Sequence, residues 1–365
     1  MKSSLFLWFS KIIYNFMTKI LKSHNKNINI FYWLSILTIM TFFMILIGGL
    51  TRLTESGLSM VDWRPIMGFL PPLNLNEWIV VFENYKKTPE FKIVNYSMEL
   101  SDFKYIFWWE WFHRFFARCI GLVFIVPFIF FFFTKQISKK LYISLFILFL
   151  FGLIQAIVGW WMVKSGLNQN PYVSNYRLAF HLTNAVIIFS ILFWLSINSF
   201  YLINLNFLPK TKLEFIFFLI ISFLFITIVS GAFMAGSHAG QSFNTYPLMN
   251  GYIFPDDYFL EDFGLKNLFE NTVAINFNHR WLSTFTFVFI LTVIIYMFIS
   301  NKFKNYNTKI LLIFFFAILQ FFLGILTLLT NVKIYYASLH QINSMLLLST
   351  ILIMYYAIKK ERFLK

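Results

Sequence analysis

The stretch LAFHLTN at residues 178–184 recurs 159 residues later as ASLHQIN at residues 337–343, and both copies stand within long apolar runs. Each copy contains the pattern His-x-x-Asn, formed by His181 with Asn184 and by His340 with Asn343. A polar pair repeated at the same place in two apolar runs indicates that the chain contains two copies of one structural unit.

Further matches between the two halves extend this repeat. The pair His113–Arg114 recurs 166 residues later as His279–Arg280. The remaining matches are Gln155 and Gly159 with Gln320 and Gly324, and Gly49, Pro65 and Met67 with Gly231, Pro247 and Met249. The offset falls from 182 residues near the start of the halves to 159 near their ends. The first half is therefore expected to have the longer loops, mainly residues 51–108.

The composition places both copies in a membrane. Hydrophobic residues make up 59% of the chain and charged residues 12%, with a mean hydropathy of +0.70. Soluble domains are nearer half apolar and a quarter charged, so the lipid bilayer is the expected solvent. A bilayer core needs about 20 apolar residues per helix. Eight stretches are long enough: 30–50, 110–133, 141–163, 177–202, 213–235, 276–300, 309–330 and 336–358.

The distribution of charge sets the expected orientation. With the N-terminus inside, the inner segments hold 17 of the 30 basic residues and only two acids, Glu214 and Glu361. This excess of inner Lys and Arg favours a topology with both termini inside. The net charge of +15 is then a topology signal, and no nucleic-acid partner is implied. The residues before the first span lack a small-residue cleavage pattern, and Leu5–Leu21 is interpreted as an amphipathic segment on the membrane surface.

The expected fold is an all-α polytopic membrane protein with eight transmembrane helices in two parallel four-helix-bundle repeats. An even number of spans in each repeat gives both copies the same orientation, unlike the inverted repeats of many transporters. The expected organisation is a basic inner segment (1–29), a first repeat (30–203), a second repeat (213–358) and a basic inner tail (359–365).

Four of the six histidines occupy repeat-equivalent places in the spans, namely His113, His181, His279 and His340. His113 and His279 are expected to begin their helices, with the other two about one turn further in. Two histidines on separate helices of each bundle can hold a haem iron from both sides. The alternative is that each histidine hydrogen-bonds between helices.

Other metal sites fit the sequence less well. A di-iron site needs several intramembrane carboxylates, and zinc sites built from histidine usually group three ligands together. Cys119 is the single cysteine, which excludes an internal disulfide or a thiolate cluster. Two haem sites, one per half, are therefore the preferred interpretation.

Arginines lie beside or one turn outward of these histidines, at Arg114, Arg177 and Arg280. Their guanidinium groups can pair with haem propionates, or they can reach to the membrane surface. His24 and His238 have no equivalent in the other half and are left out of the site.

The repeat is broken at one place that bears on chemistry. Glu110 stands three residues before His113, on the same helix face, whereas Asn276 takes that place before His279. A carboxylate there can move protons or position an oxygen intermediate, which favours the first site as the reactive one. The simpler alternative is an interfacial ion pair with Arg114 or Arg118.

Several motifs together make the chain similar to the haem A synthase family over nearly its whole length. The first half contributes GGLTRLT (48–54), SGLS (56–59), WRP (63–65), EWFHR (110–114), GWWMV (159–163), YVS (172–174) and RLAFH (177–181). The second half contributes two Ala-Gly pairs (235–236 and 239–240), FNTYPLM (243–249) and NHR (278–280). The chain lacks the outer-loop cysteine pair of some members, so it resembles the mitochondrial and alphaproteobacterial type.

The resemblance implies oxidation of a methyl group of haem O, by successive hydroxylations, to the formyl group of haem A for cytochrome c oxidase. It implies that His279 and His340 bind a haem b cofactor, that His113 and His181 hold the substrate haem, and that Glu110 is needed for activity. It also implies a haem O synthase as supplier of the substrate, an electron donor that the sequence does not identify, and a bacterial or mitochondrial inner membrane. A homo-oligomer stays open.

Two other functions are compatible with the residues alone. A bis-histidine cytochrome b would only transfer electrons, and Glu110 with its half-to-half asymmetry argues against it. A transporter with parallel repeats would use the histidines as a proton relay and would contain no haem.

Overall fold

The computed structural model describes residues 28–62, 67–168 and 170–365. Most of the basic N-terminal segment, the expected surface segment Leu5–Leu21 and the motif at 63–65 lie outside the described residues. Eight helices are long and apolar enough to cross a membrane, as predicted. They are α2 (Ile28–Leu53), α5 (Leu100–Phe133), α6 (Lys139–Gly166), α7 (Asn175–Tyr201), α8 (Lys212–Gly236), α10 (Thr272–Ile299), α11 (Asn307–Leu329) and α12 (Ile334–Leu364).

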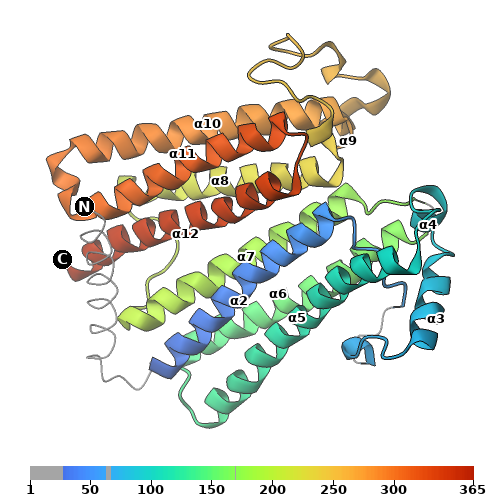
Figure 1. Ribbon diagram of the computed structural model, residues 1–365. Helices are drawn as coiled ribbons and strands as arrows, with labels where there is room; N and C mark the ends of the chain where they lie inside the picture. The colour runs from blue at the N-terminus through green and yellow to red at the C-terminus, as the bar shows by residue number, and fades with distance from the viewer. Residues whose placement is uncertain (1–27, 63–66, 169) are drawn as a thin grey trace, which may run out of the picture.

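The helices form two groups of four along the chain (Figure 1). In the first group α2 packs against α5 and α7, and α7 packs against α6. In the second group α10 packs against α8 and α11, and α12 packs against α8 and α11. The two groups meet where α7 contacts α8 and where α12 contacts α2. Helices from corresponding places in the two halves thus make corresponding contacts, an arrangement that fits the parallel repeat.

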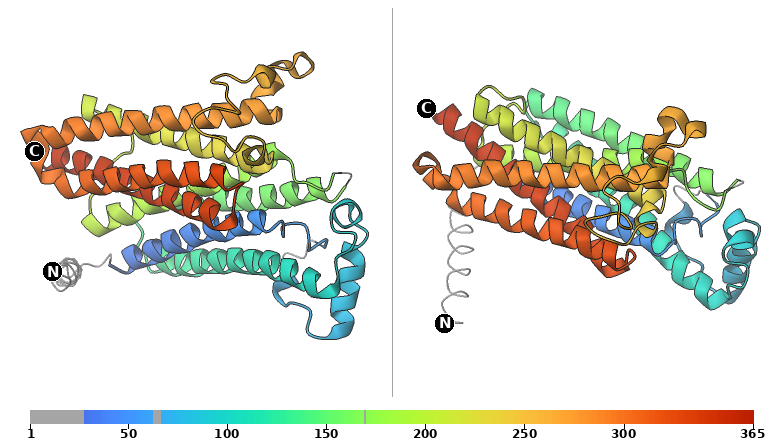
Figure 2. Two further views of the ribbon diagram at one scale, coloured as in Figure 1. Left: turned by 45° about the horizontal axis from the view of Figure 1, so that its top comes forward. Right: turned by 90° about the horizontal axis from the view of Figure 1, so that it is seen from above.

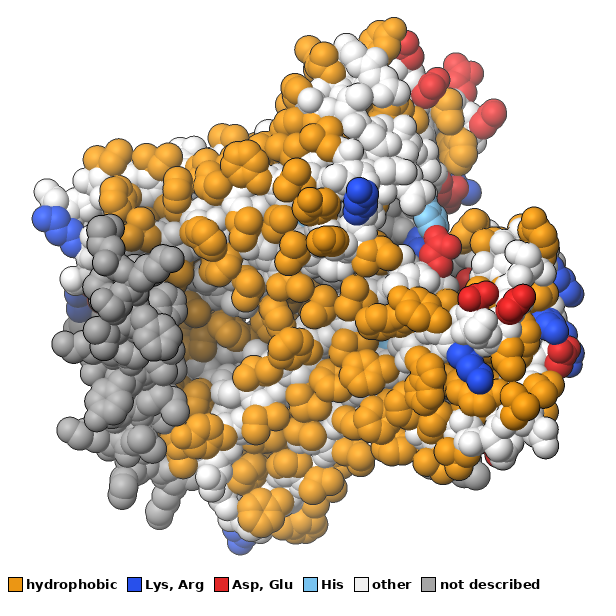
Figure 3. All heavy atoms as spheres, in the orientation of Figure 1, with side chains coloured by type: hydrophobic (Ala, Val, Ile, Leu, Met, Phe, Trp, Pro, Cys, Tyr) orange, Lys and Arg blue, Asp and Glu red, His pale blue; other side chains and the backbone are white. Residues whose placement is uncertain are grey.

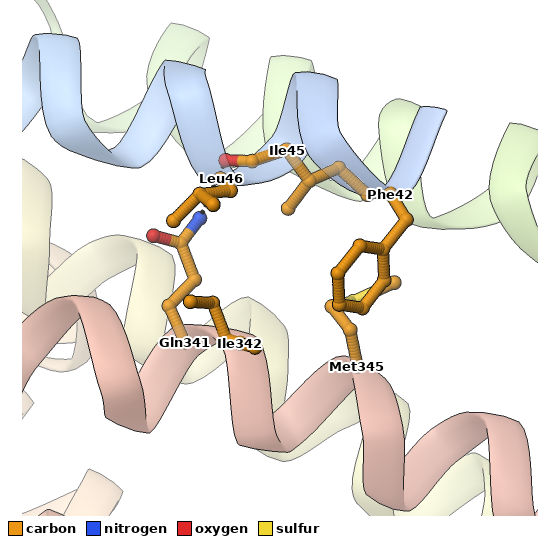
Figure 4. Close-up of a pocket in the computed structure, with 6 residues that line it drawn as sticks. All are labelled: Phe42, Ile45, Leu46, Gln341, Ile342 and Met345. Atoms are coloured by element: carbon orange, nitrogen blue, oxygen red, sulfur yellow. Dashed lines mark hydrogen bonds between the residues drawn. The ribbon is translucent and has the colours of Figure 1, made fainter. Parts of the chain in front are cut away.

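The contact between α12 and α2 includes one polar side chain. Gln341 of α12 donates a hydrogen bond from Nε2 to the carbonyl of Ile45, at 2.8 Å. Figure 4 shows this amide reaching α2 beside the facing side chains of Phe42 and Met345. Gly49 makes the approach possible, because a Cβ at that position would stand 1.7 Å from Oε1 of Gln341. The two halves are therefore joined by close packing and by a directed hydrogen bond.

A buried ion pair joins the chain between the halves to α12. Glu214 at the start of α8 accepts a hydrogen bond from Nζ of Lys359 at 3.1 Å and one from Nε of Arg362 at 2.5 Å. Lys359 also donates to the carbonyl of Leu208, at 2.6 Å. Glu214 and Lys359 are fully buried, so each charge depends on the other for its stabilisation.

One prediction about helix ends was wrong. Helix α5 begins at Leu100, about ten residues before the predicted span, so His113 lies more than three turns inside the helix. The additional turns pack against α3 (Leu75–Tyr85) and α4 (Pro89–Ile93) through the buried aromatic side chains of Trp78, Phe82, Tyr85, Phe103 and Phe107. The expected loop 51–108 is thus partly helical. Hydropathy missed these turns because aromatic packing outside the membrane stabilises them.

Short elements fill the remaining loops at the same end of the bundle as α3 and α4 (Figure 2). They are η1 (Met67–Phe69), η2 (Ala239–Gln241), η3 (Asp256–Tyr258), η4 (Glu261–Lys266) and α9 (Asn267–Glu270), whereas η5 (Asn301–Tyr306) precedes α11 at the opposite end. Apolar side chains cover the side of the bundle, and acidic side chains gather at the end with α3 and α4 (Figure 3). An apolar belt around eight helices identifies a multi-pass membrane protein.

Candidate functional site

Each of the four repeat-related histidines packs against a glycine on a neighbouring helix of its own half. An added Cβ at these glycines would lie 2.9–3.4 Å from the nearest imidazole atom. The pairs are His113 of α5 with Gly48 of α2, His181 of α7 with Gly159 of α6, His279 of α10 with Gly231 of α8, and His340 of α12 with Gly324 of α11. The absence of a side chain at these four positions makes room for four imidazole rings, two in each half.

The structure brings the histidines together in the predicted pairs. In the first half His113 and His181 are near enough to interact electrostatically, and His279 and His340 do so in the second half. His279 lies seven residues after the start of α10, so it does not begin its helix as expected. As in α5, extra turns precede the histidine. Each pair faces across a four-helix bundle, as axial ligands of one metal would.

A chain of side-chain amides supports one histidine in each half. In the first half Asn184 donates to Oε1 of Gln155 at 2.7 Å, and Nε2 of Gln155 lies 3.2 Å from Nε2 of His181. The second half repeats this arrangement with Asn343, Gln320 and His340, where the amide-to-amide bond is 2.8 Å and Nε2 of Gln320 lies 3.2 Å from Nδ1 of the ring. Both asparagines also donate to a backbone carbonyl, that of Phe151 or Phe316.

Glu110 is fully engaged with neighbouring groups in the first half. Its Oε2 accepts hydrogen bonds from Oγ of Ser59 at 2.7 Å and from the amide of Met60 at 2.8 Å. Its Oε1 pairs with Arg114, which also donates to the carbonyl of Met60. The carboxylate thus anchors the segment after α2 to α5, one turn before His113. The ion pair that sequence offered as the simpler alternative is present.

The second half has the same anchor without the charge. Asn276 donates to the carbonyl of Ala239 at 2.6 Å and accepts from Nε of Arg280, also at 2.6 Å. Arg280 donates further to the carbonyls of Phe243 and Thr245. Both halves therefore fasten the loop after their first helix by a pair of side chains four residues apart. Only the first half does so with an ionisable carboxylate.

The third arginine of the sequence prediction has a different place. Arg177 donates to the carbonyl of Trp161 at 2.6 Å, and its guanidinium lies 4.3 Å from the centre of that indole ring. It links the start of α7 to the end of α6. Like Arg114 and Arg280, it already has protein partners, and the pairing of these three residues with propionates stays a prediction.

Two residues at the junction of the halves were missed by the sequence. Arg52 of α2 donates from Nη2 to the carbonyl of Ala235, at 2.8 Å, and to Nε2 of His238, at 2.7 Å. His238 was set aside because it has no repeat equivalent, and a contact between halves needs none. The glycines and glutamines beside the ligands were present in the repeat pattern, and their four-residue spacing on one helix face was the available signal.

An open polar recess lies beside His238, between the start of α7 and the end of α8. Its volume is about 400 Å³, and its lining includes Tyr172, Ser174, His238 and Glu270. The aromatic ring of Tyr172 lies edge-on to the imidazole of His238, with 5.2 Å between ring centres. One face of the junction is thus accessible from the end of the bundle that carries α3 and α4.

The histidine pairs fit a haem better than a small metal ion. Within the described part of the chain, no group of three or more His, Cys, Asp or Glu side chains could hold a metal ion. Nδ1 of His181 is buried without a partner, as is Oδ1 of Asn343. Two opposed imidazoles per bundle, each against a side-chain-free glycine, leave room beside them for a flat macrocycle. The fold and site define a membrane protein with two bis-histidine haem-type sites.

Comparison with known proteins agrees with this class. The profile of the family described as cytochrome oxidase assembly protein (COX15-CtaA) matches residues 31–352, so the chain belongs to that family. A haem A synthase of Pelagibacter ubique is 42% identical over 330 residues, which cover 89% of this chain and 95% of the relative. Haem A synthases of Wolbachia pipientis wMel and Nitrosomonas eutropha are 40% and 37% identical, over 90% and 88% of this chain and 92% and 91% of those proteins.

Proposed function

We propose that the protein is a haem A synthase, an oxidoreductase that converts haem O to haem A. The reaction oxidises one ring methyl of haem O to a formyl group by successive hydroxylations. The observation that carries the proposal is the pair of equivalent histidine sites, of which only the first has a carboxylate in its loop anchor. A protein that only transfers electrons between two equivalent haems has no need of that difference.

The two halves are assigned different roles. In the first half His113 and His181 would hold the substrate haem, with Glu110 one turn from His113. In the second half His279 and His340 would hold haem b, which when bound supplies one-electron transfer to the reaction. Gln155 and Gln320 contact one histidine of each pair and would fix its ring orientation.

Glu110 would act in proton transfer and in positioning. Three donors hold its carboxylate, from Ser59, Met60 and Arg114. These bonds keep the segment 56–60 over the first site and help to exclude water from it. A proton taken up by the carboxylate would weaken its pairing with Arg114, so proton uptake and loop position are coupled.

The membrane assignment follows from the charge pattern of the sequence. We infer that both termini lie inside and that the end with α3 and α4 faces outside, in a bacterial inner membrane or a mitochondrial inner membrane. A haem O synthase would supply the substrate, and a separate donor would supply electrons. A homo-oligomer is compatible with the apolar outer surface.

The experiment is expression in a host that makes haem O but no haem A, followed by extraction of the haems. Haem A or hydroxylated haem O is expected with the unaltered protein. Glu110→Ala should keep the haem b spectrum and stop product formation, whereas His279→Ala should lose haem b. Glu110→Gln, which keeps the size of the side chain, tests whether charge rather than loop anchoring is needed.

The alternatives predict different outcomes. An electron-transfer cytochrome b would contain haem b in every case and yield no oxidised haem O. A transporter would purify without a Soret band. Full turnover in Glu110→Gln would remove the charge of Glu110 from the mechanism.

A further inference from the structure

Arg52 lies where the two histidine sites adjoin at the end of the bundle with α3 and α4. On α2 it is one turn beyond Gly48, against which His113 packs. The carbonyl that accepts its hydrogen bond belongs to Ala235, which is one turn beyond Gly231, against which His279 packs. The side chain thus spans from the last turn of α2 in one half to the last turn of α8 in the other.

The guanidinium of Arg52 has an unused donor. Its Nη2 serves Ala235 and His238, whereas its Nε is shut off from solvent and has no partner among the described residues. None of the ion pairs of the described chain includes Arg52. A buried guanidinium without a carboxylate is costly, and a buried donor left unmade adds to the cost.

The repeat offers no second residue of this kind. At the spacing that relates Gly49 to Gly231, the position of Arg52 corresponds to Met234, so only one cation stands at the junction. The three arginines that the sequence predicted as carboxylate partners already donate to backbone carbonyls or to Glu110. Arg52 is therefore the cation beside both sites whose buried N–H is still available.

We propose that Arg52 binds a porphyrin carboxylate at the outer edge of the histidine sites through its Nε–H. The inference rests on the proposed haem sites. A haem propionate would supply both the missing negative charge and the missing acceptor. His238 holds the other side of the guanidinium and orients it. Either haem could provide the carboxylate, since Arg52 is one turn beyond the glycines of both.

The test compares two porphyrins on the full-length protein stripped of haem. Iron protoporphyrin IX has two free carboxylates, and its dimethyl ester has none. Binding is followed by the Soret band in two backgrounds that each leave one pair intact, His279→Ala for the first site and His113→Ala for the second. Arg52→Met is expected to weaken binding of iron protoporphyrin IX by about tenfold in at least one background and to leave binding of the ester unchanged.

Control variants separate this role from a structural one. His238→Phe removes a contact between the halves but keeps the charge, and should preserve the preference for the free acid over the ester. Arg52→Lys should recover part of that preference. An equal loss for both porphyrins, or no loss for either, overturns the proposal. If neither background binds any porphyrin, the haem sites themselves are wrong, a result distinguishable from unchanged binding in Arg52→Met.

Discussion

Gly324 and His340 are fitted so closely that a Cβ at position 324 would stand 2.9 Å from Cε1 of the imidazole. The corresponding distance from position 159 to Cε1 of His181 is 3.0 Å. Contacts this short leave no space for a methyl group unless the ring moves. The position of one ligand in each half is therefore set by the lack of a side chain on the helix beside it.

Gly324→Ala should displace His340 and reduce haem b content, while the helical fold persists because alanine favours helix. The measurement is the ratio of Soret to protein absorbance after purification. Gly152→Ala is the matched control, since a Cβ there meets nothing within 4 Å. Unchanged haem content in Gly324→Ala would show that the ring position does not depend on this contact.

Gln320→Leu should weaken haem binding in the second half, because the amide that contacts His340 is lost and Asn343 loses its acceptor. Partners of this type are typically worth about 10–100-fold in metal affinity. Haem titration of the stripped protein measures the change. Gln136→Leu, at an exposed amide, should have no effect. Equal affinities in the two variants would contradict the supporting role.

Glu90→Gln should change the pH dependence of stability. Burial raises the pKa of Glu90 to about 8 from its ordinary 4.5, and Tyr85 donates to its Oε2 at 2.9 Å. Between these pH values the unfolded chain releases the proton and the folded chain keeps it, so stability falls as pH rises through this window. The melting temperature should decrease from pH 5 to pH 8 in the unaltered protein.

The Glu90→Gln variant keeps a neutral side chain at every pH and should lose most of that decrease. Glu83→Gln, at an exposed residue paired with Lys86, should retain the full slope. Parallel curves for Glu90→Gln and the unaltered protein would mean that Glu90 is already ionised in the folded state.

Glu214→Ala should destabilise the protein by about 3–5 kcal/mol, because it leaves Lys359 buried without its anion. The predicted readout is a lower melting temperature in detergent. Lys365→Ala breaks an exposed ion pair with Glu361 and should change stability by less than about 1 kcal/mol. Similar effects of the two substitutions would argue that Lys359 is stabilised by its other contacts.

The sequence predicted those parts of the fold that depend on apolar length and on repetition. Eight spans, four ligand histidines in two pairs and the Glu110–Asn276 difference could all be read from residue spacing. Helix ends could not, because the first turns of α5 are stabilised by aromatic residues of α3 and α4 that lie outside the membrane.

The junction between the halves was beyond prediction for a different reason. Arg52 and His238 are 186 positions apart and belong to different copies of the repeat. A comparison of the copies finds residues that recur, whereas a contact between copies involves residues that differ. The same holds for Gln341, which stands where the first half has Leu182.

The reciprocal packing of α7 on α8 and of α12 on α2 bears on how such a protein could arise. Each four-helix unit offers its first and its last helix to the other unit. A single unit therefore contains both surfaces of the junction, and two identical copies can close the same ring of four helices. A symmetric homodimer of a half-length ancestor is sufficient as a starting point, and gene fusion would then have allowed each copy to change alone, one acquiring a carboxylate and the other an amide at the position of Glu110.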